Sequence, residues 1–270
     1  MQDIADAGDH VTADAVAWAG ALAIVAGSAG HIDETPTRDP IRNDGARYHA
    51  WLRAVDAHGA ARWSRRIDDA REIHARAIAT LGDGVVVAGE QRTGNVRAYT
   101  AWVASLDGEG RERWRLAALG DPGITGLQAV ASRGDGSVLA GGANGGAAWL
   151  VAVDPHGALR WSHAVAGLDE IKAVLATPSG GVVAGITGRT TTHDGRSQLI
   201  AVDATGAPRW TIEVPEHGPG ELAAIAALGD GGVAVGHAPD EHGRDSAWLV
   251  RFTVDGKLRT SEVIPGTASS

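Results

Sequence analysis

Two sets of residues, most of them polar, stand at matching positions in five stretches of the chain, and they are the first candidates for chemistry. One set comes just before a recurring alanine: Asp14, Arg76, Gln128, Lys172 and Ala223. The other comes just after a recurring glycine: Ser28, Glu90, Gly142, Ile186 and His237. Polar groups that converge from equivalent positions suit a pocket for a sugar or another small molecule. The alternative is a hydrated lining around a central channel.

Histidines near acidic residues form a second group of candidates. His31 lies close to Asp33, and His237 precedes Asp240 and His242. None of these groups has a spacing known for zinc ligands, and the chain has no cysteine for a thiolate site. We therefore predict no metal and no cofactor, and we keep His31 and Asp33 as candidates for ligand binding.

Carboxylates that face each other across a cleft would support glycoside hydrolysis. Glu90 could form such a pair with Asp33, Glu170 or Glu221. No G-x-S-x-G segment occurs, so a serine nucleophile is not predicted. Catalysis needs a differentiated acid and base in one place, whereas similar repeats favour recognition. We predict no catalytic residue, with a glycan-acting hydrolase in a central funnel as the alternative.

The elements that must position these residues recur five times. The segment AWLVAVDPHGALRW ends at Trp161, and related segments end at Trp63, Trp114, Trp210 and Thr260. Their first large residues are Trp51, Trp102, Trp149, Gln198 and Trp248, which gives periods of 51, 47, 49 and 50 residues. A second hairpin, AIATLGDGVVVAG, closes at Gly89 and recurs upstream of each segment. Repeats of this length indicate one structural unit per copy.

Each copy reads as four short strands. Runs such as VVVAG and WLVAV are rich in β-branched residues or Trp and are bounded by Gly and Asp turns. Asp154 to Gly157 suits a type I turn with glycine in the left-handed position. We predict one all-β domain over residues 1–270, a five-bladed β-propeller with four antiparallel strands per blade. The predicted blades span about 11–67, 73–118, 124–166, 168–214 and 220–265. The spacing also predicts that Trp149 and Trp161 share one blade face.

Loop lengths distinguish the two ends of the predicted blades. Tight turns join the first strand to the second and the third to the fourth, so one face is short. The opposite face, here called the long-loop face, carries residues 28–50, 90–101, 142–148, 186–198 and 237–247. Function concentrates on loops that a scaffold positions but does not need. We therefore expect the ligand on the long-loop face, beside the long first loop and the channel mouth.

Composition excludes several classes of protein. The 270 residues carry a net charge of −9 and lack a run of Lys and Arg that would follow a phosphate backbone, so nucleic acid is not an expected partner. No stretch is long enough for a membrane-spanning helix, and the acidic start of the chain predicts no signal peptide. The chain has nine Trp but two Tyr and one Phe. Thin layers of Ala and Val plugged by a few large rings are therefore expected.

The AVDPHGALRW and DGVVVAG segments resemble repeats of bacterial quinoprotein-like propellers, including lipoprotein-type ones, from about Val11 to Ile264. The resemblance implies a periplasmic or secreted propeller that binds a protein, a small molecule or a glycan. Quinone-cofactor enzymes of this kind typically have eight blades and often an adjacent cysteine pair, so no quinone is expected here. A repeating glycan-binding lectin is a further alternative. It would require exposed Trp residues, whereas their paired positions predict burial.

Overall fold

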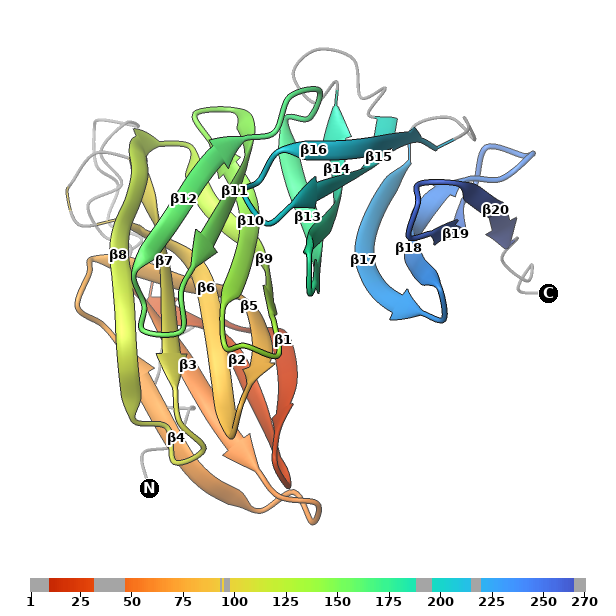
Figure 1. Ribbon diagram of the computed structural model, residues 1–270. Helices are drawn as coiled ribbons and strands as arrows, with labels where there is room; N and C mark the ends of the chain where they lie inside the picture. Colours follow the sequence, from red (N-terminus) through yellow and green to blue (C-terminus); the bar gives the residue numbers. More distant parts are fainter. Residues whose placement is uncertain are drawn as a thin grey trace, which may run out of the picture. The chain divides into compact units, whose positions relative to one another are not determined.

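The computed structural model describes residues 10–31, 47–92, 94, 98–187, 196–214 and 220–264 (Figure 1). These residues form β-strands joined by turns and loops, and no helix long and apolar enough to cross a membrane occurs among them. The chain divides into two compact units, residues 1–140 with 152–160, and residues 141–151 with 161–270. The prediction of an all-β fold is confirmed.

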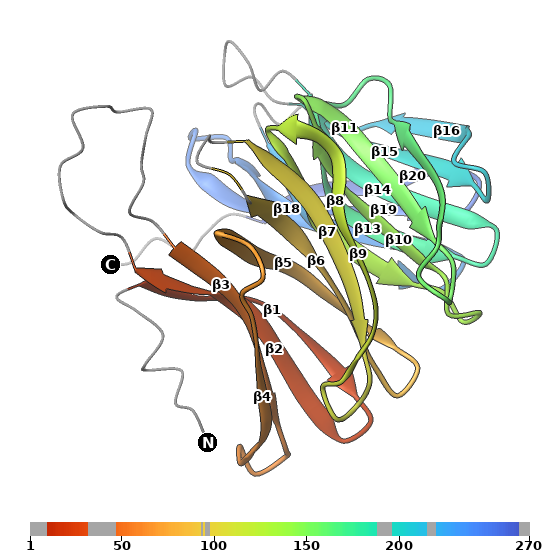
Figure 2. The ribbon, with the colours of Figure 1, turned by 90° about the vertical axis from the view of Figure 1, so that its left-hand side faces the viewer.

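The first eight strands belong to one sheet in the first unit, and they form two antiparallel groups of four (Figure 2). The first group is β1 (His10–Ala19), β2 (Leu22–His31), β3 (Arg47–Val55) and β4 (Ala61–Ile67). The second is β5 (Glu72–Leu81), β6 (Gly84–Arg92), β7 (Tyr99–Leu106) and β8 (Glu112–Gly123). A single parallel residue pair, Tyr48 with Glu72, joins the two groups.

The remaining strands form three sheets of four, each in chain order. The third sheet is β9 (Thr125–Ser132), β10 (Val138–Asn144), β11 (Ala147–Val153) and β12 (Leu159–Ala164). The fourth is β13 (Glu170–Thr177), β14 (Gly180–Thr187), β15 (Arg196–Asp203) and β16 (Pro208–Glu213). The fifth is β17 (Glu221–Leu228), β18 (Gly231–Pro239), β19 (Asp245–Thr253) and β20 (Leu258–Ile264). The fourth and fifth sheets are antiparallel throughout.

The core of the first unit is made of small and β-branched side chains with one large ring. Ile24, Leu52, Val87 and Trp102 are each 0% exposed and belong to one apolar cluster. Almost every residue of β6 and β7 is buried, so both faces of these middle strands are covered. Burial of such a side chain contributes about 1.5–3 kcal/mol. The predicted Ala and Val layers are therefore confirmed.

A recurring Trp on the fourth strand of a copy binds the last turn of the next copy. The indole nitrogen of Trp63 on β4 donates to the carbonyl of Gly108, 2.9 Å away in the turn between β7 and β8. A Cβ atom added at Gly110 would lie 2.9 Å from the Trp63 ring, so glycine is needed there for space as well as for its φ of +78°. The same contact recurs farther along the chain, with donation from Trp161 to Ala204 at 2.9 Å and from Trp210 to Val254 at 3.0 Å.

The two recurring Trp residues do not share a face in the first and second copies, which argues against the prediction that Trp149 and Trp161 share one. In the first copy Trp51 pairs with Arg66, whereas Trp63 pairs with Ala54. Side chains alternate between the faces of a strand, so the three-residue offset from Trp51 to Ala54 places the two rings on opposite faces. The second copy has the same offset, since Trp114 pairs with Ser105 rather than with Trp102.

The predicted turns are confirmed in detail. In the turn after β11, the backbone amides of His156 and Ala158 donate to Asp154 Oδ1 at 2.9 and 2.8 Å. Gly157 has a φ of +86°. The aspartate therefore satisfies amides that the ladder does not pair, which explains why Asp and Gly recur three residues apart in these turns.

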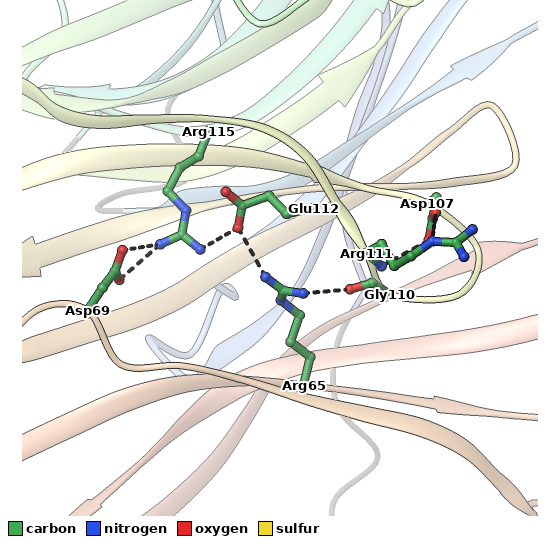
Figure 3. A network of polar contacts seen from close by, with 7 residues as sticks. All are labelled: Arg65, Asp69, Asp107, Gly110, Arg111, Glu112 and Arg115. Carbon is green, nitrogen blue, oxygen red and sulfur yellow. Dashed lines mark hydrogen bonds and ion pairs between the residues drawn. The ribbon is translucent and has the colours of Figure 1, made fainter.

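An ionic network joins the outer strands β4 and β8 (Figure 3). Arg115 donates to both oxygens of Asp69 at 2.8 and 2.9 Å and to Glu112 at 2.6 Å. Arg65 donates to the same carboxylate of Glu112 at 3.3 Å and to the carbonyl of Gly110 at 3.1 Å. The network therefore fixes neighbouring copies at their outer edge.

Candidate functional site

Four of the five residues of the first predicted set lie on β-bulges. Ala75 pairs with Gly89 and Ala77 with Ala88, which leaves Arg76 as the extra residue of β5. Matching register shifts fall at Asp14, Lys172 and Ala223. A bulge redirects the side chain of its extra residue, and bulges are frequent beside active sites. Four copies thus have an irregular position on the first strand, and in three of them it holds a charged side chain: Asp14, Arg76 and Lys172.

Arg76 and Glu90 meet across β5 and β6. The Arg76 guanidinium donates to Glu90 Oε1 at 2.6 and 3.2 Å, with side chains 33% and 19% exposed. A Cβ atom at Gly126 would lie 2.7 Å from Glu90 Oε2, so this glycine leaves room for the carboxylate. The prediction from sequence named both residues, and the structure brings them together.

A second ion pair lies nearer the same ends of β5 and β6 and was missed from the sequence. Arg92 on β6 donates to Glu72 on β5, and the two side chains are 1% and 5% exposed. The hydroxyl of Tyr99 donates to the same carboxylate, and the Arg92 guanidinium lies 5.9 Å from the centre of the Tyr99 ring. Nε and Nη1 of Arg92 are buried without an acceptor among the residues that the structure describes. The attraction between two buried charges offsets only part of the cost of removing them from water. The burial of this pair is therefore weak evidence that its role is only to stabilise the fold.

Three aromatic rings lie next to these ion pairs. The His74 ring centre is 5.0 Å from that of Tyr48 and 6.5 Å from that of Tyr99, with tilts of 39° and 48°. Tyr48 and Tyr99 are the only tyrosines of the chain, and each stands three residues before the recurring Trp of its copy. We refer to the whole group as the aromatic–ion cluster: Tyr48, Glu72, His74, Arg76, Glu90, Arg92 and Tyr99.

Burial sets the protonation states in the cluster. It lowers the pKa of His74, and the nearby Arg76 charge lowers it further. The imidazole is therefore neutral near neutral pH, with one nitrogen that donates and one that accepts. Burial, helped by the hydrogen bond to Glu72, raises the pKa of Tyr99 to about 12, so the hydroxyl keeps its proton. The cluster thus offers donors and acceptors side by side.

The aromatic–ion cluster lies at the strand ends of the long-loop face. Tyr48 is near the start of β3 and Tyr99 is at the start of β7. His74 is near the start of β5, and Glu90 is near the end of β6. Asp14 is close enough to His74 for its charge to act on the imidazole. The side chain of His31 and all of Asp33 lie outside the described residues.

The other predicted residues are placed elsewhere. Gln128 is half-buried on β9. In the second unit the Lys172 ammonium lies 3.1 Å from Glu170 and 3.5 Å from Glu221. His237 is exposed on β18 and pairs across the sheet with Glu221.

Three of the carboxylates considered for hydrolysis are held in ion pairs and do not face each other as a free pair. Glu90 is bound by Arg76, and Glu170 and Glu221 are both bound by Lys172 in the second unit. Within the described ranges, no group of three His, Asp or Glu side chains is arranged to hold a metal.

The recurring Trp residues on the third strands form no exposed platform. Trp51, Trp102, Trp149 and Trp248 are 8%, 0%, 6% and 4% exposed. The fourth-strand residues Trp63, Trp114, Trp161 and Trp210 are half-buried, with their rings packed on the turn glycines of the next copy. The expected burial is confirmed for the third-strand rings, whereas the fourth-strand rings are half-buried against turn glycines. Neither set forms the exposed platform that a repeating lectin needs.

Comparison with solved structures identifies the fold. Hydrazine synthase from Kuenenia stuttgartiensis is similar at a TM-score of 0.59 and 11% identity, over 91% of this chain and 64% of that chain. A structure described as the Dos1 propeller is similar at a TM-score of 0.51 and 12% identity, over 94% of this chain and 61% of that one. The β-propeller domain of the Trilobed protease from Pyrococcus furiosus is similar at a TM-score of 0.50 and 9% identity, over 95% and 71%.

The fold is a β-propeller. No family model matches the sequence, and no curated protein matches it. The chain spans 64% of the hydrazine synthase chain, and at 11% identity this likeness concerns the fold alone.

Proposed function

We propose that the chain is a five-bladed propeller that acts as a non-catalytic ligand-binding module. Its binding site would be the aromatic–ion cluster on the long-loop face, at the mouth of the channel. The partner is a small molecule, a glycan or a segment of another protein. Five blades are supported by the four-stranded groups β1–β4, β5–β8, β9–β12, β13–β16 and β17–β20, since the first two groups share only one residue pair.

The observation that carries this proposal is that the cluster is not part of the repeat. The position of Arg92, three residues after the recurring glycine, holds Gly30, Asn144, Gly188 and Pro239 in the other copies. The position of the tyrosines, three residues before the recurring large residue, holds Gly146, Gly195 and Asp245 in the last three copies. These copies form their strands without an arginine or a tyrosine at these positions. A buried polar group that the scaffold does not require favours a functional role.

Pairing of the acids supports binding rather than hydrolysis. Glu72 is bound by Arg92 and Tyr99, and Glu90 is bound by Arg76. A glycosidase places one carboxylate on each side of the scissile bond. In this cluster each carboxylate is held by a guanidinium. Such a pair offers a donor next to an acceptor, which suits the recognition of polar groups.

A thermal-shift screen of small molecules against three proteins tests the proposal. A ligand that binds the folded state at about 100 times its Kd stabilises it by about 2.7 kcal/mol. We expect at least one compound to raise the melting temperature of the wild type but not that of Tyr48→Ala. The matched control is Trp18→Ala, which removes a ring that is 61% exposed on β1, and it should keep the shift. If the ligand raised the melting temperature of Tyr48→Ala as much as that of the wild type, the cluster would not be the binding site.

A further inference from the structure

We infer that the ligand of the aromatic–ion cluster is a neutral sugar rather than an anion or a cation. This inference rests on the proposed function and adds the chemical class of the ligand. Three features of the cluster carry it: the pairing of its charges, the unsatisfied donors of Arg92, and the combination of half-buried rings with a neutral imidazole.

The charges of the cluster are already neutralised in pairs. Arg76 holds Glu90, and Arg92 holds Glu72. A charged ligand would have to displace one partner of a pair and leave the other unsatisfied, which is costly in a partly buried site. A hydroxyl group can accept from a guanidinium and donate to the adjacent carboxylate at the same time. Two neighbouring hydroxyls of a sugar therefore match an Arg–Glu pair that remains intact.

The surroundings of the Arg92 guanidinium favour a ligand whose acceptor atoms carry no charge. Its Nε and Nη1 lack an acceptor among the described residues, although its side chain is only 1% exposed. A buried donor without a partner is unfavourable, so an oxygen that reaches it would be bound. The Glu72 carboxylate already accepts from the same guanidinium. A second carboxylate there would be repelled by Glu72, whereas a hydroxyl or ring oxygen would not.

The rings provide the apolar part of such a site. Tyr48, His74 and Tyr99 are half-buried, so each keeps some exposed surface. The C–H groups on one side of a sugar ring can pack on the negative face of an aromatic ring. Neutral His74 supplies one donor and one acceptor beside these rings. A sugar carries C–H groups next to hydroxyl groups. Apolar ring faces that lie next to paired donors and acceptors are therefore complementary to it.

The test uses sets of sugars that differ only in charge. Glucose, galactose and mannose are each compared with the corresponding uronate and amino sugar by calorimetric titration near neutral pH. We expect saturable binding of the neutral member of at least one set. Its uronate and its amino sugar should bind about tenfold more weakly or worse, because each charge disrupts an ion pair. The affinity of the neutral sugar should change less than about twofold between roughly 0.05 and 0.5 M NaCl.

Two variants of Tyr48 distinguish an error in the class of ligand from an error in the location of the site. Tyr48→Phe keeps the ring and should retain binding within about threefold, whereas Tyr48→Ala should abolish it, because the stacking surface is removed. Tighter binding of a uronate or an amino sugar, or the absence of saturable binding by every neutral sugar, would overturn the inference. If the charged ligand is lost in Tyr48→Ala, the site stands and only its ligand class is wrong. If any of these ligands binds Tyr48→Ala as tightly as wild type, the proposed function fails as well.

Discussion

Arg92 and Glu72 form an ion pair across β6 and β5 with side chains 1% and 5% exposed. This pair is present in one copy of a repeat whose other copies hold Gly, Asn or Pro at the position of Arg92. It is therefore a local addition to the scaffold, and the half-buried rings of Tyr48, His74 and Tyr99 are grouped near it.

Removal of one partner of this pair should be strongly destabilising. Glu72→Ala leaves the Arg92 guanidinium buried without a counter-charge, and we expect a loss of about 3–5 kcal/mol in the free energy of unfolding. Urea unfolding measures it as a lower midpoint with an unchanged slope. The control is Asp68→Asn, which breaks a pair with Arg66 whose side chains are 59% and 54% exposed and should cost less than about 1 kcal/mol. Equal losses for the two variants would contradict the burial of the Glu72 pair.

The packing of Trp63 on the turn glycine of the next copy can be tested with two glycines of almost identical backbone conformation. Gly110 and Gly59 have φ of +78° and +77°, but only at Gly110 would a Cβ atom meet a ring, at 2.9 Å. Gly59→Ala should cost about 1–2 kcal/mol, from backbone strain alone. Gly110→Ala should cost a further 1–3 kcal/mol or so, because the Trp63 ring must move.

Chemical denaturation of both glycine variants decides between strain and packing. If Gly110→Ala is no more destabilising than Gly59→Ala, the ring does not constrain the turn. Trp63→Ala combined with Gly110→Ala provides the matched cycle, since the added methyl group should cost less once the ring is absent.

Stability should depend on pH through His49, which is buried, and His74, which is half-buried. Burial lowers the pKa of His74 and of His49 in the folded state, whereas the unfolded side chains titrate near 6.5. Between the lowered pKa values and about 6.5 the unfolded chain binds more protons, so the free energy of unfolding falls as the pH falls through this window. His74→Gln should flatten the dependence in urea titrations, and His74→Gln with His49→Gln should flatten it further. An unchanged slope in the double variant would contradict this assignment.

The repeat made most of the fold predictable from the sequence. Asp154 and Gly157 specify a turn by hydrogen bonding and by backbone freedom, which are local properties of the residues themselves. The alternation of strands and turns follows from the same kind of local signal. The expectation that both Trp residues of a copy share a face is not met in the first copy, because the face depends on the hairpin register. There Trp63 pairs with Ala54, three positions from Trp51.

The candidate site was only partly predictable. Arg76 and Glu90 were found because they occupy matching positions where the copies differ. Glu72, His74 and Arg92 were missed because their partners are set by cross-strand pairing, such as that of Glu72 with Arg92. One sequence signal was available: the two tyrosines of the chain stand in the same position of the first two copies.

The central claim, that a ligand binds at the aromatic–ion cluster, is tested most directly by the ring signals of His74. In a histidine-labelled sample, His74→Gln identifies the His74 resonances in a nitrogen–proton correlation spectrum. On titration with the sugar that binds, the His74 signals should shift saturably with the Kd found by calorimetry. The signals of His58, which is exposed in the turn between β3 and β4 at the opposite end of β3 from Tyr48, should stay in place. Unchanged His74 signals at a saturating concentration of the sugar would contradict the account.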